Sequence, residues 1–287
     1  MPTFDTPEPI SATISLATGN VRITASDRTD TVVEIRPSDE LNDADTRAAE
    51  QIRVEYSGGR LLVKTPGDKN RSWLERDGSV EVTIDLPTDS RVDANTSADL
   101  RCEGRLGEST FTTASGDIWL DQTDKLRLNT ASGDITVARS VGHTDVTSAD
   151  GGIRIGEIYG TAVIKTTNGD IALGEVTGDL RLNTAYGDIT VDRALASIGA
   201  KSAHGSVRIG EVVRGSVALE TASGELEVGI REGTAAWLDV QTRYGTVSNS
   251  LESCDDPGPS DETAKVRAHT EYGDIVIRRS LPFSSPG

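Results

Sequence analysis

The chain has 287 residues, a formal net charge of −17 and few aromatic side chains: 3 Phe, 5 Tyr and 3 Trp. Its 46 acidic residues outnumber 29 basic ones, which argues against binding to nucleic acid or to an anionic membrane surface, because both need clustered Lys and Arg. A chain with so few large side chains can fill a thin core of Val, Ile and Leu more easily than a thick globular core.

The N-terminal sequence predicts neither export nor membrane insertion. The opening MPTFDTPEPIS lacks a basic segment followed by an apolar one, and no apolar run approaches the ~18 residues of a membrane helix. We therefore expect a cytoplasmic protein. In that compartment Cys102 and Cys254, which share no motif, are expected to be reduced thiols.

Residues 1–111 predict wide, decorated β coils that begin near Ile10. Strands are expected at Thr31–Ile35 and Val80–Leu86, and a charged loop that contains Trp73 at 67–78. The polar stretch 39–51 predicts a short helix or a lid, because the end of a repeat array needs a cover.

Residues 112–279 contain nine copies of a short string, such as TASGDITV from Thr130 and TAYGDITV from Thr184. Successive glycines of the string are 17, 18, 18, 18, 18, 19, 21 and 28 residues apart. We call them the repeat glycines: Gly116, Gly133, Gly151, Gly169, Gly187, Gly205, Gly224, Gly245 and Gly273. So short a period indicates stacked supersecondary units. An insertion at Ser253–Glu262 is expected to bulge from the penultimate turn and to explain the spacing of 28.

Each repeat has two segments with alternating apolar residues, one before the glycine and one after it. In one repeat these are Leu180 and Leu182, then Ile189 and Val191, which predicts two strands with one buried face each. Helical repeats do not tolerate this density of glycine and β-branched residues. A hexapeptide helix needs an aliphatic residue every six positions, and Ile118 is followed at that interval by Asp124. The calcium-binding GGxGxD run is absent from the sequence.

The fold class is therefore all-β: one parallel, flattened β-solenoid of ~18-residue coils in a single continuous domain. Its parts are the decorated coils of 1–111 with the helical segment at 39–51, the regular coils of 112–279, and a polar tail at 280–287. The glycines are assigned to the turns.

The residue three places before each repeat glycine is Thr or Ser. We expect it to point inward at the bend, satisfy turn amides there and form a hydrogen-bonded ladder. The column consists of Thr113, Thr130, Ser148, Thr166, Thr184, Ser202, Thr221, Thr242 and Thr270.

The residue after the glycine is acidic in six of nine repeats: Asp117, Asp134, Asp170, Asp188, Glu225 and Asp274. Stacked carboxylates suggest a cation-binding ladder, but the favoured interpretation is turn-forming residues that bond nearby backbone amides. We expect no metal site, since His143, His204 and His269 occupy different places in the repeat.

The residue before the glycine is aromatic in several repeats. Tyr186, His204, Tyr244 and Tyr272 are candidates for a surface that binds a partner or stacks on a sugar. Ordinary packing between neighbouring strands is the alternative and the favoured interpretation.

The recurring G-D-I-x-V strings, the opening MPTFDTPEPISATISLATGNVRITASDRTDTVVEIRPSD and the closing YGDIVIRRS resemble the DUF4097 family of β-strand-repeat proteins in its actinomycete form. That family is also labelled "putative adhesin". The resemblance covers essentially the whole chain and implies a β-solenoid. It implies no reaction and no catalytic residues.

These observations predict a non-enzymatic scaffold that interacts with a protein partner or with itself. No catalytic motif and no cofactor site is recognised in the sequence. The alternatives are an exported adhesin or carbohydrate-binding protein, and a glycan-active enzyme that uses carboxylates on an outer face.

Overall fold

The computed structural model describes residues 1–65, 78–252 and 262–280. These residues form two compact units, 1–141 and 142–287, which we describe separately. In both units parallel β-strands wind into stacked coils. The described residues contain one α-helix, α1 (Asp43–Gln51). The predicted all-β, parallel β-solenoid class and the short N-terminal helix are thereby confirmed.

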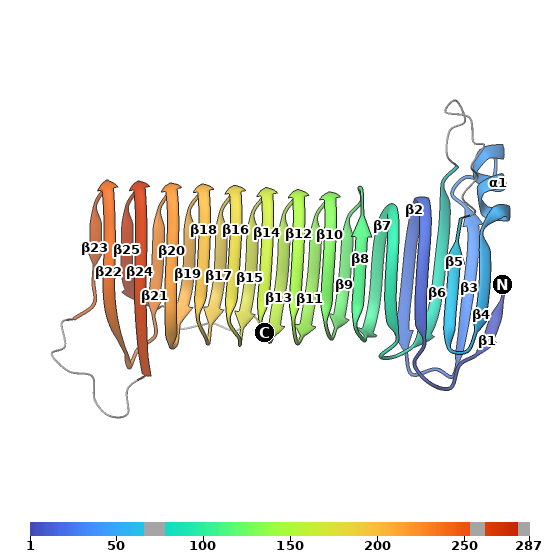
Figure 1. The fold of residues 1–287 in the computed structure, drawn as a ribbon, viewed down its shortest axis with the longest axis horizontal. Coiled ribbons are helices and arrows are strands. Elements are labelled where there is room, and N and C mark those ends of the chain that lie inside the picture. The colour runs from blue at the N-terminus through green and yellow to red at the C-terminus, as the bar shows by residue number, and fades with distance from the viewer. Residues whose placement is uncertain (66–77, 253–261, 281–287) are drawn as a thin grey trace. The chain divides into compact units, whose positions relative to one another are not determined.

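Unit 1 combines long and short strands (Figure 1). Besides α1, its elements are β1 (Thr3–Asp5), β2 (Ser11–Ser26), β3 (Asp30–Pro37), β4 (Arg53–Ser57), β5 (Arg60–Lys64), β6 (Val80–Pro87), β7 (Arg91–Leu106), β8 (Ser109–Thr113), β9 (Ile118–Thr123), β10 (Leu126–Ser132) and β11 (Ile135–Val141). Strands β2 and β7 have 16 residues each and run parallel to one another. The first half of β7 pairs with β8 and its second half with β9, so one long strand supplies both sides of a coil.

The start of unit 1 carries additional antiparallel strands and the helix. β3 pairs antiparallel with β1 and β6, and β4 with β5. Asn42 caps α1 by accepting the Ala44 N–H, at 2.9 Å. The buried Asp45 carboxylate accepts the N–H groups of Asp39 (3.1 Å) and Ser79 (2.9 Å), which fixes the helix to its surroundings.

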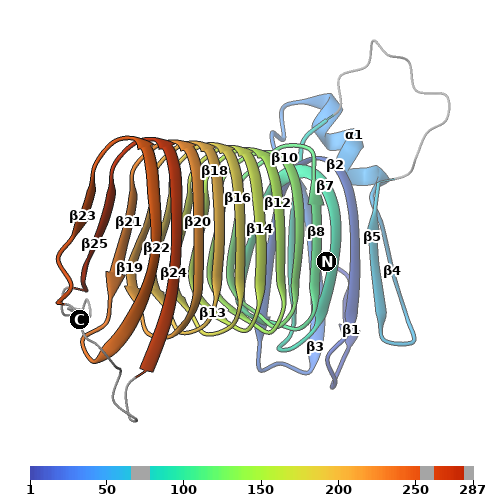
Figure 2. The same ribbon diagram turned by 60° about the vertical axis from the view of Figure 1, so that its left-hand side comes forward.

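Unit 2 consists of regular coils of two strands each. Its strands are β12 (Thr144–Asp150), β13 (Ile153–Tyr159), β14 (Ala162–Asn168), β15 (Ile171–Val176), β16 (Leu180–Tyr186), β17 (Ile189–Ala194), β18 (Ile198–His204), β19 (Val207–Val212), β20 (Gly215–Ser223), β21 (Leu226–Ile230), β22 (Thr234–Tyr244), β23 (Val247–Asn249), β24 (Glu262–Tyr272) and β25 (Ile275–Arg279). Even-numbered strands pair with one another along one side and odd-numbered strands along the other, all in parallel. Figure 2 shows the chain of unit 2 bending between the two sides in every coil.

The last two coils of unit 2 do not follow sequence order. β24 pairs with β20 on one side and with β22 on the other, and β25 likewise lies between β21 and β23 (Figure 1). The coil β22–β23, which we call the end coil, is therefore outermost although β24–β25 follows it in the chain. Equivalent strands of successive repeats would pair in a regular solenoid, and here they do not, because β20 pairs with β24 and not with β22. The two long spacings between repeat glycines, 21 and 28 residues, occur where the chain skips the coil position next to β20–β21 to form the end coil, and then returns to fill that position with β24–β25.

The core of each coil is thin. In coil β16–β17 its large side chains are Leu180, Leu182, Ile189 and Val191, and the small Ala194 lies beside them, all at most 2 % exposed. Because each coil covers its neighbours, four aliphatic side chains per layer suffice, and large aromatic residues are not needed.

Several sequence expectations concern residues outside the described ranges. They are most of the predicted loop at 67–78 with Trp73, nearly all of the insertion before Glu262, Cys254, and all but the first residue of the tail at 280–287.

Candidate interaction surfaces

The repeat glycines lie at the bend between the two strands of each coil, and eight of the nine have positive φ; Gly245 is the exception. At Gly187 φ is +143°, and a Cβ would stand 2.2 Å from the Gly169 carbonyl oxygen of the preceding coil. The bend thus demands glycine for two reasons: backbone conformation and close approach of successive coils.

The Thr and Ser residues three places before these glycines point inward, and all but Thr242 are buried. Their hydroxyls donate to backbone carbonyls at the bend instead of accepting from amides. Thr113 donates to Ser115 O (2.7 Å), Thr221 to Gly205 O (3.0 Å) and Thr242 to Gly273 O (2.8 Å). The column lies inside the solenoid, away from any external ligand.

The acidic residues after the repeat glycines hold the next coil by its backbone. Asp117 Oδ1 accepts the Asp134 N–H (2.8 Å), Asp170 Oδ1 that of Asp188 (2.8 Å), and Asp274 Oδ1 that of Thr246 (2.8 Å). This bond from the Thr246 backbone lowers the pKa of Asp274 below its ordinary value. No group of three His, Cys, Asp or Glu able to hold a metal ion occurs within the described residues.

The three histidines do not form a cluster, and each contacts a different kind of side chain. His143 Nδ1 lies 2.9 Å from Thr161 Oγ1, and His269 Nε2 lies 3.8 Å from Asp239 Oδ1. His204 stacks on Tyr186, with ring centroids 5.2 Å apart and planes at 13°.

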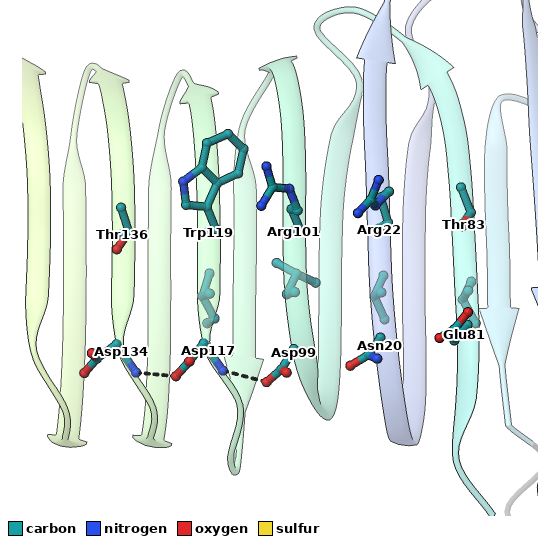
Figure 3. A pocket seen from close by; sticks show the side chains of 14 residues that line it. Asn20, Arg22, Glu81, Thr83, Asp99, Arg101, Asp117, Trp119, Asp134 and Thr136 are labelled. Atoms are coloured by element: carbon teal, nitrogen blue, oxygen red, sulfur yellow. Dashed lines mark hydrogen bonds between the residues drawn. The ribbon is translucent and has the colours of Figure 1, made fainter. Parts of the chain in front are cut away.

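A shallow groove of about 780 Å³ crosses one face of unit 1 (Figure 3). Two rows of side chains line it. The strands β6, β2, β7, β9 and β11 each contribute one residue to both rows, β9 and β11 with the residue just before the strand for the lower row. The upper row is Thr83, Arg22, Arg101, Trp119 and Thr136, and the lower row is Glu81, Asn20, Asp99, Asp117 and Asp134. The upper row supplies cations and an aromatic ring, and the lower row carboxylates and an amide.

Trp119 is held on one side by a cation. The guanidinium of Arg101 lies 4.5 Å from the Trp119 ring centroid, and its Nε donates to Glu103 at 2.8 Å. That hydrogen bond lowers the pKa of Glu103. The residue in register on the other side of Trp119 is Thr136, whose short side chain leaves space beside the ring. Beneath this face Cys102 is fully buried, and burial raises the pKa of its thiol far above the ordinary range, so it is unreactive.

The predicted aromatic residues of unit 2 form two stacked pairs at the bend. Tyr186 stacks on His204, and Tyr244 on Tyr272 with centroids 4.9 Å apart and planes at 12°. The three tyrosines are 55–57 % exposed. The structure therefore brings all four candidates to one edge, where their rings face solvent.

The end coil exposes positions that are buried in the inner coils. Leu238 and Val240 are only half-buried, although Leu180 and Leu182 at the same places are buried. Val247 is 44 % exposed, whereas Ile189 at its place is fully buried. Among the described strands, none pairs with β22 on the side away from β24, or with β23 on the side away from β25.

Sequence reasoning did not identify the groove of unit 1 or the ion-pair network on β17. Arg193 bonds Glu175 (3.0 Å) and Glu211 (2.9 Å) on the coils before and after its own. The spacing of 18 residues between these three positions predicts such contacts once the coils are known to stack in register.

Fold and repeat together define a parallel β-solenoid repeat protein. The family model "Toastrack DUF4097" matches residues 11–278, so the chain belongs to the DUF4097 family. The search of curated proteins gave no match.

Three solved structures of similar chains come from Bacteroides and Parabacteroides species. A "putative adhesin" from Bacteroides fragilis is 14 % identical over 96 % of this chain and 95 % of that one, with a TM-score of 0.38. A "putative adhesin" from Parabacteroides merdae is 12 % identical over 79 % and 94 %, with a TM-score of 0.45. A "putative lipid binding protein" from Parabacteroides distasonis is 11 % identical over 96 % and 95 %, with a TM-score of 0.43. Similarities at this level support no argument about what this chain binds.

Within the described part of the chain, no helix has the length and apolarity needed to span a membrane.

Proposed function

We propose that the protein is a non-enzymatic, cytoplasmic scaffold that associates with a second copy of itself through the end coil. The observation that supports this most is the exposure of Leu238, Val240 and Val247, which stand where the inner coils have buried core residues. A β-strand with a free edge and an uncovered apolar face favours pairing with another strand.

A second copy suits this edge because β22 is self-complementary in charge. If two β22 strands pair antiparallel about Gln241, Asp239 of each copy faces Arg243 of the other. The apolar residues of the two end coils then meet in a common core. The net charge of −17 opposes this contact, so association is expected to strengthen as salt screens the repulsion.

Sedimentation velocity over a range of protein and salt concentrations tests the proposal. The unaltered chain and Val141→Lys are expected to dimerise, and Val247→Lys to remain monomeric. Val141 is a matched control because it is 46 % exposed at the end of β11 in unit 1 and receives the same charge. A chain that is monomeric under all conditions, or a Val247→Lys variant that dimerises as well as the control, contradicts the proposal.

The groove of unit 1 favours a second candidate function, carbohydrate binding as in an exported adhesin. Trp119 offers a ring beside the small Thr136, and the carboxylates and amide of the lower row can accept or donate bonds to sugar hydroxyls.

Glycan-array binding of the unaltered chain, Trp119→Ala and Trp237→Ala tests this second candidate. Trp237 is a matched control, since it also carries a cation, Lys265 Nζ at 4.8 Å from its ring, but lies in unit 2. Binding that Trp119→Ala alone removes supports a saccharide site. Absence of binding, or equal loss in both variants, argues against it.

A further inference from the structure

The aromatic residues at the bend of unit 2 leave a gap one strand wide. In spatial order the residues before the repeat glycines are Tyr186, His204, Ser223, Tyr272 and Tyr244, as the registers of β16, β18, β20, β24 and β22 show. Four of the five have rings, and the middle one is serine. This order is visible only in the structure, because β24 lies between β20 and β22 (Figure 1).

The gap has the dimensions of a ring-binding slot. The rings of the two existing pairs are 5.2 Å and 4.9 Å apart and nearly parallel, at 13° and 12°. His204 and Tyr272 stand on strands two places apart, hence about 9.6 Å from one another. A planar ring above Ser223 would thus lie about 4.8 Å from both neighbours, within the range that aromatic pairs prefer.

Acidic residues around the slot determine which kind of partner segment could insert an aromatic ring there. Glu225 lies two residues after Ser223, and Glu271 immediately precedes Tyr272. Both side chains are exposed, and neither has an ion-pair partner within the described ranges. The cation nearest in register, Arg243 beside Glu271, lies over the Tyr244 ring, 5.4 Å from its centroid. Two carboxylates without an ion pair beside the slot favour a guest that carries positive charge next to its ring.

A groove of about 500 Å³ lies next to the slot along the chain. Its lining includes Ala203 and Ala222, which directly precede His204 and Ser223, and the ion pair Lys201–Glu220. The short alanine side chains leave room for the chain that carries the inserted ring.

We propose that the gap above Ser223 is a binding slot for an aromatic side chain, tryptophan above all, of a partner protein segment that carries adjacent basic residues. The guest completes a five-ring stack from Tyr186 to Tyr244, and its basic neighbours pair with Glu225 and Glu271. The slot itself lies between β18 and β24, and only the outermost ring of the stack, Tyr244, belongs to the end coil. The proposal does not depend on self-association.

NMR titration with short capped peptides tests the slot, using the full chain and following the His204 and Tyr272 signals. The probes are Lys-Trp-Lys, Lys-Ala-Lys and Glu-Trp-Glu, with cellotriose as the saccharide probe. Ser223→Tyr fills the slot with the chain's own ring, and Ser223→Ala keeps it open. Folding of both variants is checked by the dispersion of the remaining amide signals.

Lys-Trp-Lys is expected to shift both rings and to bind the unaltered chain and Ser223→Ala equally, but Ser223→Tyr roughly tenfold more weakly. Lys-Ala-Lys is expected to leave the rings unperturbed, and Glu-Trp-Glu to bind more weakly than Lys-Trp-Lys. The proposal is overturned if Ser223→Tyr binds as well as Ser223→Ala, if the alanine peptide binds as well as the tryptophan peptide, or if only cellotriose binds. If Ser223→Tyr does not fold, Tyr272→Ala replaces it, with the same weakening expected.

Discussion

The end coil and the inner coils of unit 2 have the same repeat pattern but differ in burial. In the inner coil β16–β17, Leu182 and Ile189 are sealed between two neighbours, whereas Val240 and Val247 of the end coil have a described neighbour on one side only. Identical patterns thus give a closed core in one place and an apolar surface in the other. In a stacked array burial is decided by the neighbouring coil, so a terminal repeat keeps an apolar face exposed until another surface covers it.

Truncating an apolar side chain to alanine in an inner coil and in the end coil should give the largest difference in the free energy of unfolding. Ile189→Ala removes a fully buried side chain and is expected to lower the free energy of unfolding by about 2–5 kcal/mol. Val247→Ala removes a side chain that is 44 % exposed and should cost less than about 1 kcal/mol in the dilute monomer. Urea unfolding measures both values. Equal losses would mean that the end coil is covered in solution.

Glycine substitutions test how closely coils approach at the bend. Gly187→Ala is expected to cost at least about 1–3 kcal/mol, because alanine is strained at φ +143° and its Cβ would meet the Gly169 carbonyl at 2.2 Å. Gly199 in β18 is the control, since a Cβ there meets no atom within 4 Å and φ is ordinary. Gly199→Ala should be neutral or stabilise by less than about 1 kcal/mol. Thermal unfolding of both variants distinguishes these outcomes, and similar melting points would contradict the close-approach argument.

Acid titration addresses the bond that fixes the end coil to its neighbour. The Thr246 N–H lowers the pKa of Asp274 in the folded chain, so the contribution of this bond is complete above about pH 4 and is lost as the pH falls through the lowered value. The Thr246 amide signal, followed by NMR, should therefore shift with a midpoint below that of a free Asp. Asp274→Asn should remove this transition. A midpoint at or above the ordinary value would mean that the bond is absent.

The repeat was predictable because its chemistry is local. The glycines, the alternation of residues such as Leu180 and Leu182, and the Thr or Ser before each bend all lie within one coil. The spatial order of the last coils was not predictable, because β22 and β24 both match the pattern that pairs with β20. The choice between them depends on how the chain returns from β23 to β24, which the repeat pattern does not specify.

Some features of the candidate surfaces were likewise predictable from the sequence, and others were not. The stacking of Tyr186 on His204 could be expected from consecutive repeats of equal length. The contact of Arg101 with Trp119 could not, since Arg101 belongs to the 16-residue strand β7, where the repeat glycine is missing and the register cannot be counted from it. The gap at Ser223 likewise follows from the placement of Tyr272 next to it and not from the sequence order.

Hydrogen exchange of β22 and β23 at low and high protein concentration tests the central claim most directly. If the end coil is an interaction surface for a second copy, the amides of Gln241, Arg243 and Val247 gain protection as concentration rises, and those of the inner strand β16 stay unchanged. Amides of β22 and β23 that exchange at the same rate at every concentration would contradict it.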